Sequence, residues 1–142
     1  GVYNFNPNEN KLSFITKAID LPQGVGISPD NKTLYVNKMG LLDGNPRVIS
    51  LDLENNESSV LFDGKDLAEI HEGNFDGMAV HSSGNIFTSG PGGLLVISPE
   101  GELMAKIDSG HLTNATFDDD EGYLYLTGFV SNPKVFRIKI KN

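Results

Sequence analysis

One five-residue pattern occurs three times along this chain, and it constrains the possible folds more than any other feature. Each copy begins with a polar residue, continues as a short apolar strand, and is followed by a polar turn and a second apolar strand. The copies are Gln23-Gly24-Val25-Gly26-Ile27, Asp76-Gly77-Met78-Ala79-Val80 and Thr113-Asn114-Ala115-Thr116-Phe117. An antiparallel unit repeated with connections of variable length predicts a series of similar sheets arranged around an axis.

The rest of the chain favours an all-β fold. Short runs rich in Val, Ile, Leu, Phe, Tyr and Thr alternate with clusters of Gly, Pro, Asn and Asp, which is typical of many short antiparallel strands. Only residues 65–71 predict a short helical turn, because glycines flank a small apolar group there. Grouping the strands in fours gives two complete blades, with strands at 24–28, 34–37, 47–53 and 59–63, and at 77–81, 86–89, 94–98 and 103–107.

Incomplete blades are expected at both ends of the chain. Strands at 2–5 and 12–16 read as the outer half of a preceding blade, and those at 115–117, 124–127 and 135–140 as the inner strands of a following one. The chain is therefore predicted to be one segment of about three blades, divided at 1–20, 21–70, 71–110 and 111–142. Because an open arc leaves apolar faces uncovered, we expect a missing N-terminal half or a second copy of the chain to cover them.

Composition excludes several classes of function. The 142 residues carry a formal net charge of −8, which disfavours binding to nucleic acid because phosphate backbones require a basic surface. No apolar run approaches the roughly 20 residues that cross a bilayer, so no membrane partner is expected. Without cysteine there is neither a disulfide framework nor a thiolate site. We expect a soluble protein, and the sequence leaves open whether it is cytoplasmic or exported.

Several segments in order resemble the gluconolactonase family, which includes regucalcin (the senescence marker protein) and bacterial sugar lactonases. The resemblance rests on Gly1-Val2-Tyr3, residues 21–36 (LPQGVGISPDNKTLYV), Asp76-Gly77-Met78-Ala79-Val80, residues 84–93 (GNIFTSGPGG) and Arg137-Ile138. It implies a partial six-bladed β-propeller that corresponds to the C-terminal half of the family's fold. It also implies hydrolysis of a sugar lactone at one divalent cation in the central channel.

The resemblance implies site residues as well. The family holds its metal through a Glu, an Asn in a Pro-Asn-Gly segment and an Asp in an Asp-Gly-Met segment. Asp76 occupies the position of that Asp, and Gln23 stands where the Asn is usual. The family's Glu has no counterpart in these residues, so part of the site is expected to come from elsewhere.

Physical reasoning on the repeat leads to the same residues. In a propeller the inner strand of each blade starts near the axis, so Gln23, Asp76 and Thr113 are expected to point into a shared funnel. Amide, carboxylate and hydroxyl oxygens suit Ca²⁺ and are compatible with Mg²⁺ or Zn²⁺. Asp76 could be a metal ligand, a general base or both. The alternative is that Asp76-Gly77 only forms a tight turn.

Four further residues are candidates for the site. The side chain of Gln23 is one methylene longer than that of Asn, which displaces its donor atom, so ligation by Gln23 stays open. Thr113 and Asn114 are expected to line the funnel and contact substrate. His111, just before them, could reach the funnel as a proton shuttle, although a surface or packing role is the alternative.

Two functions follow as expectations. The first is a metal-dependent lactonase with Asp76 in its site, inactive as the isolated chain. The second is a non-catalytic propeller module that binds a sugar or a protein. A self-associating half-ring is a third, weaker possibility.

Overall fold

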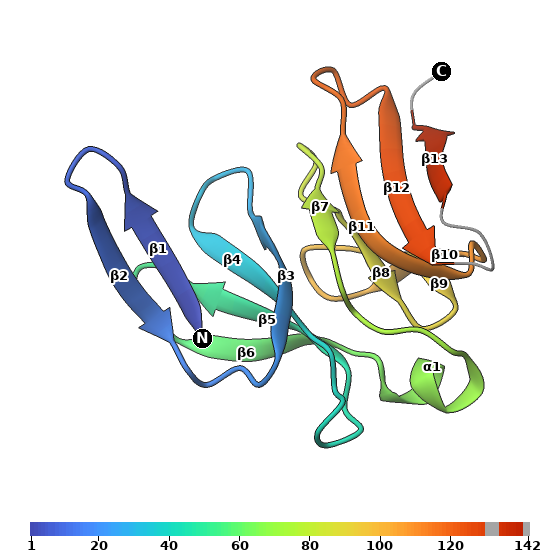
Figure 1. Cartoon of the computed structure of the whole chain (residues 1–142), viewed down its shortest axis with the longest axis horizontal. Coiled ribbons are helices and arrows are strands. Elements are labelled where there is room, and N and C mark those ends of the chain that lie inside the picture. Colours follow the sequence, from blue (N-terminus) through green and yellow to red (C-terminus); the bar gives the residue numbers. More distant parts are fainter. Residues whose placement is uncertain (130–133, 141–142) are drawn as a thin grey trace.

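The computed structural model describes residues 1–129 and 134–140, and in these residues the chain forms thirteen strands and one short helix. Residues 130–133 and 141–142 of the predicted last blade lie outside the described part. All strand pairs are antiparallel, and they make four separate sheets. Figure 1 shows these sheets following one another across the molecule, from β1–β2 at one side to β11–β13 at the other.

Two of the sheets have four strands in simple sequential order. The second sheet contains β3 (Pro22–Ile27), β4 (Thr33–Lys38), β5 (Arg47–Asp52) and β6 (Ser58–Asp63). The third contains β7 (Met78–Val80), β8 (Ile86–Gly90), β9 (Gly93–Ile97) and β10 (Leu103–Ile107). The helix α1 (Lys65–Ile70) connects them and ends one residue before the predicted helical turn does.

The sheets at the two ends are smaller. The first has only β1 (Val2–Asn6) and β2 (Lys11–Thr16), and the fourth has β11 (His111–Phe117), β12 (Tyr123–Phe129) and β13 (Lys134–Lys139). This arrangement of four-stranded antiparallel sheets with incomplete ends is that of a partial β-propeller, as the sequence predicts.

Each pair of neighbouring sheets encloses its own hydrophobic cluster. Val2, Ile19, Val36 and Ile49 pack between the first and second sheets. Tyr35, Val48, Phe75, Met78, Ile86, Leu95 and Ile97 pack between the second and third. Phe87, Leu94, Val96, Leu112, Ala115, Leu124 and Leu126 pack between the third and fourth. Stacking of sheets face to face is therefore what holds the arc together.

The third sheet is buried on both faces, and its sequence reflects this. Successive residues of β8 and β9 alternate between two clusters: Ile86 and Leu95 face the second sheet, whereas Phe87 and Leu94 face the fourth. Both strands are consequently buried over their whole length, because side chains of a strand point alternately to its two faces. In contrast, every residue of the outer strand β10 is exposed.

In the part of the chain that the structure describes, no helix combines the length and the apolar composition needed to cross a bilayer.

Candidate functional site

The beginnings of the three inner strands are joined by backbone hydrogen bonds. The N–H of Gly24 donates to the carbonyl oxygen of Asp76 at 2.7 Å, and the N–H of Gly77 donates to the carbonyl oxygen of Thr113 at 2.8 Å. These bonds connect the second, third and fourth sheets at one point. The three copies of the repeated pattern therefore meet in space at their polar first residues.

Glycine is required at two positions of this junction. A Cβ on Gly24 would lie 2.2 Å from the carbonyl oxygen of Asp76, and one on Gly77 would lie 2.5 Å from the Cα of Asn114. Both distances are shorter than any normal contact, and the neighbouring atoms belong to the backbone. The glycines of the repeat thus permit the close approach of neighbouring inner strands.

A polar pocket of about 410 Å³ lies at this junction. Four of the five predicted site residues line it: Gln23, Asp76, Thr113 and Asn114. The fifth, His111, begins β11 with an exposed side chain and does not line this pocket. The geometry therefore gathers an amide, a carboxylate and a hydroxyl from three sheets around one space.

Two of these residues are placed by irregularities in the inner strands. The pairing of β3 with β4 shifts register between Pro22 and Val25, and that of β11 with β12 shifts between Leu112 and Asn114. Gln23 and Thr113 thus lie inside their strands, at bulges, whereas the sequence placed them just before the strands. Strand pairing continues beyond each bulge, to Pro22 with Lys38 and to His111 with Phe129. Bulges change the direction of side chains and often occur beside functional sites.

Asp76 has a distinct electrostatic environment. Its side chain is half-buried, and this burial raises the pKa of the carboxyl group above its usual value. Among the described residues, its carboxylate forms no ion pair. A partly buried carboxylate without a cationic partner is unfavourable in the charged form, and a bound cation would relieve this.

The backbone on both sides of Asp76 is held by residues that the sequence reasoning missed. Its N–H donates to Oγ of Ser89 at 2.8 Å, and its carbonyl oxygen accepts a second bond, from Nδ2 of Asn37 at 2.7 Å. Nδ2 of Asn37 also donates to Oγ1 of Thr88 at 2.8 Å. All three partners are buried. The sequence signal that could have identified these three residues is a polar side chain within an otherwise apolar strand, β4 for Asn37 and β8 for the other two.

The other pocket residues have local partners. The hydroxyls of Thr113 and Thr127 lie 2.8 Å apart, and Oδ1 of Asn114 accepts the N–H of Ala115 at 2.9 Å.

The donor set fits a hard divalent cation only in part. Its oxygens are of the type that Ca²⁺ and Mg²⁺ prefer, but it includes one carboxylate. Within residues 1–129 and 134–140, no three His, Cys, Asp or Glu side chains are grouped so that they could hold a metal ion.

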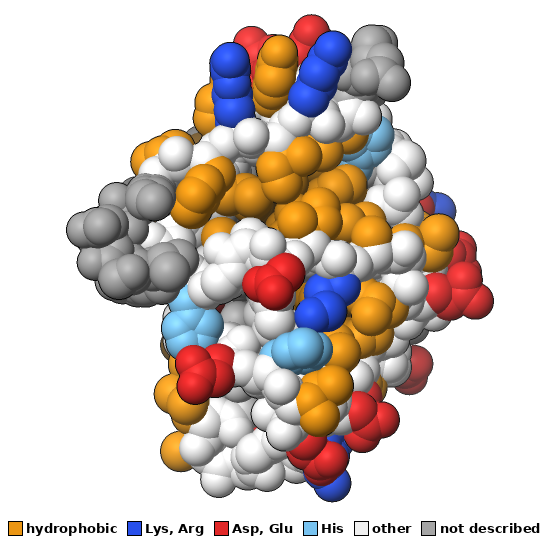
Figure 2. Space-filling model, turned by 90° about the vertical axis from the view of Figure 1, so that its right-hand side faces the viewer, with side chains coloured by type: hydrophobic (Ala, Val, Ile, Leu, Met, Phe, Trp, Pro, Cys, Tyr) orange, Lys and Arg blue, Asp and Glu red, His pale blue; other side chains and the backbone are white. Residues whose placement is uncertain are grey.

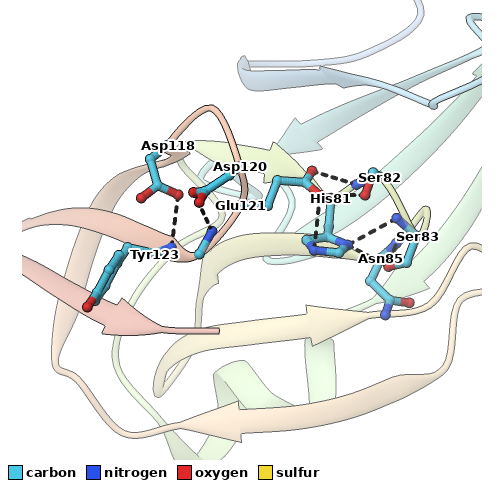
Figure 3. A network of polar contacts seen from close by, with 9 residues as sticks. His81, Ser82, Ser83, Asn85, Asp118, Asp120, Glu121 and Tyr123 are labelled. Atoms are coloured by element: carbon cyan, nitrogen blue, oxygen red, sulfur yellow. Dashed lines mark hydrogen bonds and ion pairs between the residues drawn. The ribbon is translucent and has the colours of Figure 1, made fainter. Parts of the chain in front are cut away.

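A second polar cluster lies at the opposite end of the inner strands (Figure 3). Oε1 of Glu121 accepts the N–H of Ser82 at 2.7 Å, and Oε2 lies 3.2 Å from Nε2 of His81. Nδ1 of His81 accepts the N–H of Ser83 at 3.0 Å. These contacts connect the β7–β8 hairpin with the β11–β12 hairpin. They act as a structural link between the third and fourth sheets.

The acidic run of the β11–β12 hairpin, residues 118–121, forms a turn. Oδ1 of Asp118 accepts the N–H of Tyr123 at 2.9 Å, and Oδ1 of Asp120 accepts the N–H of Gly122 at 3.2 Å. Carboxylates used in this way stabilise the turn itself.

Comparison with known proteins identifies the family. Residues 1–129 match the model of the SMP-30/Gluconolactonase/LRE-like region. The chain belongs to this family. The resemblance expected from the sequence is therefore confirmed, and a lactonase-type hydrolase is the general activity with which the family is associated.

The relatives of this family member are longer proteins. A gluconolactonase of Zymomonas mobilis is 30% identical over 153 aligned positions, which cover 99% of this chain and 40% of that protein. The structure of a gluconolactonase from Xanthomonas campestris aligns with a TM-score of 0.75 and 25% identity, over 89% of this chain and 40% of the other. The chain thus spans less than half the length of these relatives.

A third comparison supports the fold alone. The structure of regucalcin from Agrobacterium tumefaciens, described as a calcium-binding protein, aligns with a TM-score of 0.69 and 20% identity, over 88% of this chain and 43% of the other.

Proposed function

We propose that this chain is part of a metal-dependent lactonase that opens the ring ester of a sugar lactone. Membership of the gluconolactonase-like family and the 30% identical gluconolactonase support this class of reaction. The observation that carries the proposal is the Asp76 carboxylate, half-buried in a polar pocket where three sheets meet, without a cationic partner among the described residues.

Asp76 is the residue we propose to hold the cation, and Gln23 is the second candidate ligand. Ca²⁺ is the favoured ion because the donors are carboxylate and amide oxygens, with Zn²⁺ and Mg²⁺ as alternatives. When bound, such a cation would polarise the lactone carbonyl and lower the pKa of a water molecule. The incomplete donor set means that the proposal requires ligands from further polypeptide.

Asp76 is also the proposed general base. The oxygen of water adds to the lactone carbonyl carbon while a carboxylate oxygen of Asp76 accepts its proton. The ring carbon–oxygen bond then breaks, the proton passes to the departing alkoxide oxygen, and the product is an open-chain hydroxy acid.

Thr113 and Asn114 are the proposed substrate contacts, since both line the pocket. Their hydroxyl and amide groups are suited to the hydroxyls of a sugar. His111 remains a candidate proton shuttle that lies outside the pocket, so a role for it requires a substrate that extends beyond the pocket.

We further propose that a longer polypeptide, or a second copy of the chain, completes the propeller. This rests on the length of the relatives and on the two-stranded first sheet, which lies beside complete sheets of four strands. The 142-residue chain alone is expected to be inactive, because the proposal draws part of the ligand set from the added polypeptide.

The test combines hydrolysis with cation binding on the complete propeller. Asp76→Asn and Asp76→Ala should abolish hydrolysis of gluconolactone and weaken the binding of Ca²⁺ or Zn²⁺ measured by calorimetry. Asp119→Asn, in an exposed hairpin turn, is the matched control and should leave both unchanged. Cation-dependent hydrolysis that persists in Asp76→Asn would contradict the proposal, and so would full activity of the isolated chain as a monomer.

One observation favours a second candidate, a non-catalytic module that binds a sugar or a protein. Gln23 is exposed and longer than the Asn usual in the family, and one carboxylate is a sparse ligand set. Calorimetry separates the two functions. If the complete, folded propeller binds neither Ca²⁺ nor Zn²⁺, the module is favoured over the enzyme.

A further inference from the structure

The buried amide of Asn37 has an unusual hydrogen-bonding state. Asn37 is fully buried, and both hydrogens of its Nδ2 are used, on the carbonyl oxygen of Asp76 and on Oγ1 of Thr88. Its Oδ1 is also buried and has no hydrogen-bond partner within the described residues. A flipped amide would place Oδ1 against the Asp76 carbonyl oxygen, where two acceptors would repel each other. The observed orientation is therefore the one that chemistry requires.

The unpaired buried Oδ1 lowers stability and offsets part of what the two hydrogen bonds of Nδ2 contribute. Burying a polar atom without a partner is unfavourable, and an apolar side chain of similar shape would avoid it. What the amide provides is a bond across two sheets, from β4 to Asp76, which lies two residues before the start of β7.

The bonds around Asp76 determine where its side chain points. Ser89 accepts the N–H of Asp76, which belongs to the peptide group before its Cα. Asn37 and the N–H of Gly24 both donate to its carbonyl oxygen, which belongs to the peptide group after its Cα. Since peptide groups are planar, fixing both planes fixes φ and ψ, and with them the direction of the Cα–Cβ bond.

Ser89 also connects this arrangement to the third sheet. Its Oγ donates to the carbonyl oxygen of Gly77 at 3.3 Å, while the N–H of Ser89 donates to the same oxygen at 3.1 Å. Ser89 is almost completely buried, with 1% of its surface exposed. The segment 76–77 is therefore held from the β4 side and from the β8 side by groups that water does not reach.

We propose that Asn37 and Ser89 are positioning residues that aim the Asp76 carboxylate into the pocket. This inference rests on the proposed function, since it concerns the same carboxylate. The unpaired Oδ1 of Asn37 is a stability disadvantage that accompanies this role. Small errors in the position of a catalytic or ligating group strongly reduce activity, so loss of either bond should be visible at the site.

Asn37→Leu is the main test, because leucine has a similar shape and no donor. In the complete propeller we expect unfolding in urea to be unchanged or to require more denaturant, because the unpaired Oδ1 is gone. Cation affinity should fall at least tenfold and kcat at least tenfold, with a smaller change in KM. Ser89→Ala is the second variant and should show the same losses at the site.

Ser98→Ala is the matched control. Oγ of Ser98 is buried and accepts the N–H groups of Glu100 and Glu102 in the β9–β10 hairpin, away from the pocket. This variant should lose stability and keep its cation affinity and kcat.

The outcomes separate the two proposals. If Asp76→Asn loses cation binding but Asn37→Leu and Ser89→Ala retain the wild-type affinity and kcat, the positioning role is wrong and the proposed function stands. If the two variants lose stability in proportion to activity, as a purely structural role requires, the positioning role is also wrong. If Asp76→Asn itself changes nothing, both proposals fail.

Discussion

At the scale of single residues, the site depends on how closely the backbones of neighbouring inner strands approach each other. Gly24 and Gly77 lie where the N–H of one strand meets the carbonyl oxygen of the residue at the start of the next. Neither has the positive φ that only glycine adopts easily. Glycine is therefore needed at these two positions because a Cβ does not fit there, and not because of the backbone conformation.

Gly24→Ala and Gly77→Ala should each destabilise the protein by about 3 kcal/mol, because the new methyl group would overlap backbone atoms that cannot move independently. Urea unfolding measures the change. Gly122→Ala is the control, since its Cβ would meet only the end of the Asp120 side chain. It should change stability by less than about 1 kcal/mol. Equal effects of all three substitutions would contradict this explanation.

The raised pKa of Asp76 makes a prediction with a definite sign. The folded state holds the Asp76 proton more tightly than the unfolded state does. The carboxyl group of Asp76 therefore stabilises the folded protein most at pH values below the ordinary pKa of Asp. Its contribution is lost as the pH rises through the raised, folded value. In the absence of cations, the stability difference between Asp76→Asn and the wild type should therefore shift in favour of the variant as the pH rises.

Urea unfolding at a series of pH values tests this, with the difference between the two proteins as the readout. The difference is needed because other carboxylates act in the opposite direction: hydrogen bonding to Lys38 lowers the pKa of Asp43 to about 2. Adding Ca²⁺ at neutral pH should stabilise the wild type and not the variant. A stability difference between the two proteins that does not change with pH would indicate that burial does not raise the pKa of Asp76.

At the scale of elements, the segment before β7 is fixed by packing as well as by hydrogen bonds. Phe75 is fully buried between the second and third sheets, and its ring meets that of Phe62 edge to face, with centroids 6.2 Å apart. Asp76 follows directly. The apolar anchor and the polar site residue are thus neighbours in the chain, one pointing into the core and the other to the pocket.

Phe75→Ala should destabilise the protein by about 3–5 kcal/mol, because it removes a buried ring and leaves a cavity. Phe75→Leu should cost less, since most of the volume is retained. Ile70→Ala on α1 is the control, because 72% of Ile70 is exposed, and it should change stability by no more than about 0.5 kcal/mol. Denaturant unfolding measures all three. If Ile70→Ala lowered the stability as much as Phe75→Ala does, Phe75 would not be a residue on which the core depends.

At the scale of the whole molecule, the arc leaves apolar surface uncovered. A groove of about 470 Å³ lies between β1 and β3, and its lining includes Val2, Tyr3, Ile15, Val25, Ile27 and Leu34. On the opposite side of the molecule, which Figure 2 shows, hydrophobic side chains form a band between groups of charged ones. Large exposed apolar surfaces usually mark sites of contact with other protein. This supports the proposal that further polypeptide completes the propeller.

Val25→Lys should distinguish the isolated chain from the complete propeller. Val25 is 53% exposed here, so the isolated chain should tolerate lysine with a change within about 0.5 kcal/mol. In the complete protein the same side chain would be buried against added strands, and an unpaired buried charge should prevent assembly or remove activity. Unfolding of the isolated chain and activity of the complete protein are the two measurements.

Leu42→Lys serves as the control for that substitution. Leu42 is 75% exposed in the loop between β4 and β5, away from the groove, so neither measurement should change. If Val25→Lys also leaves the complete protein active, β3 is not covered by further polypeptide.

The sequence by itself determined the strands and their grouping, and it singled out Asp76 as the main candidate site residue. Alternation of side chains and turn-forming residues are local properties, so they can be read from short segments such as 76–89. The repeat predicted that Gln23, Asp76 and Thr113 come together, and they line one pocket. The sequence did not reveal the bulges at Gln23 and Thr113, because strand register depends on the partner strand.

Only the tertiary structure decided which polar residues hold Asp76 in place. Asn37 precedes Asp76 by 39 residues, and Ser89 follows it by 13. No periodicity links such distant positions, since their contacts arise when sheets stack and bring separate strands together. The same stacking left His111 outside the pocket, although it lies only two residues before Thr113 in the chain. Local pattern specified the elements, and long-range packing specified which of their side chains meet.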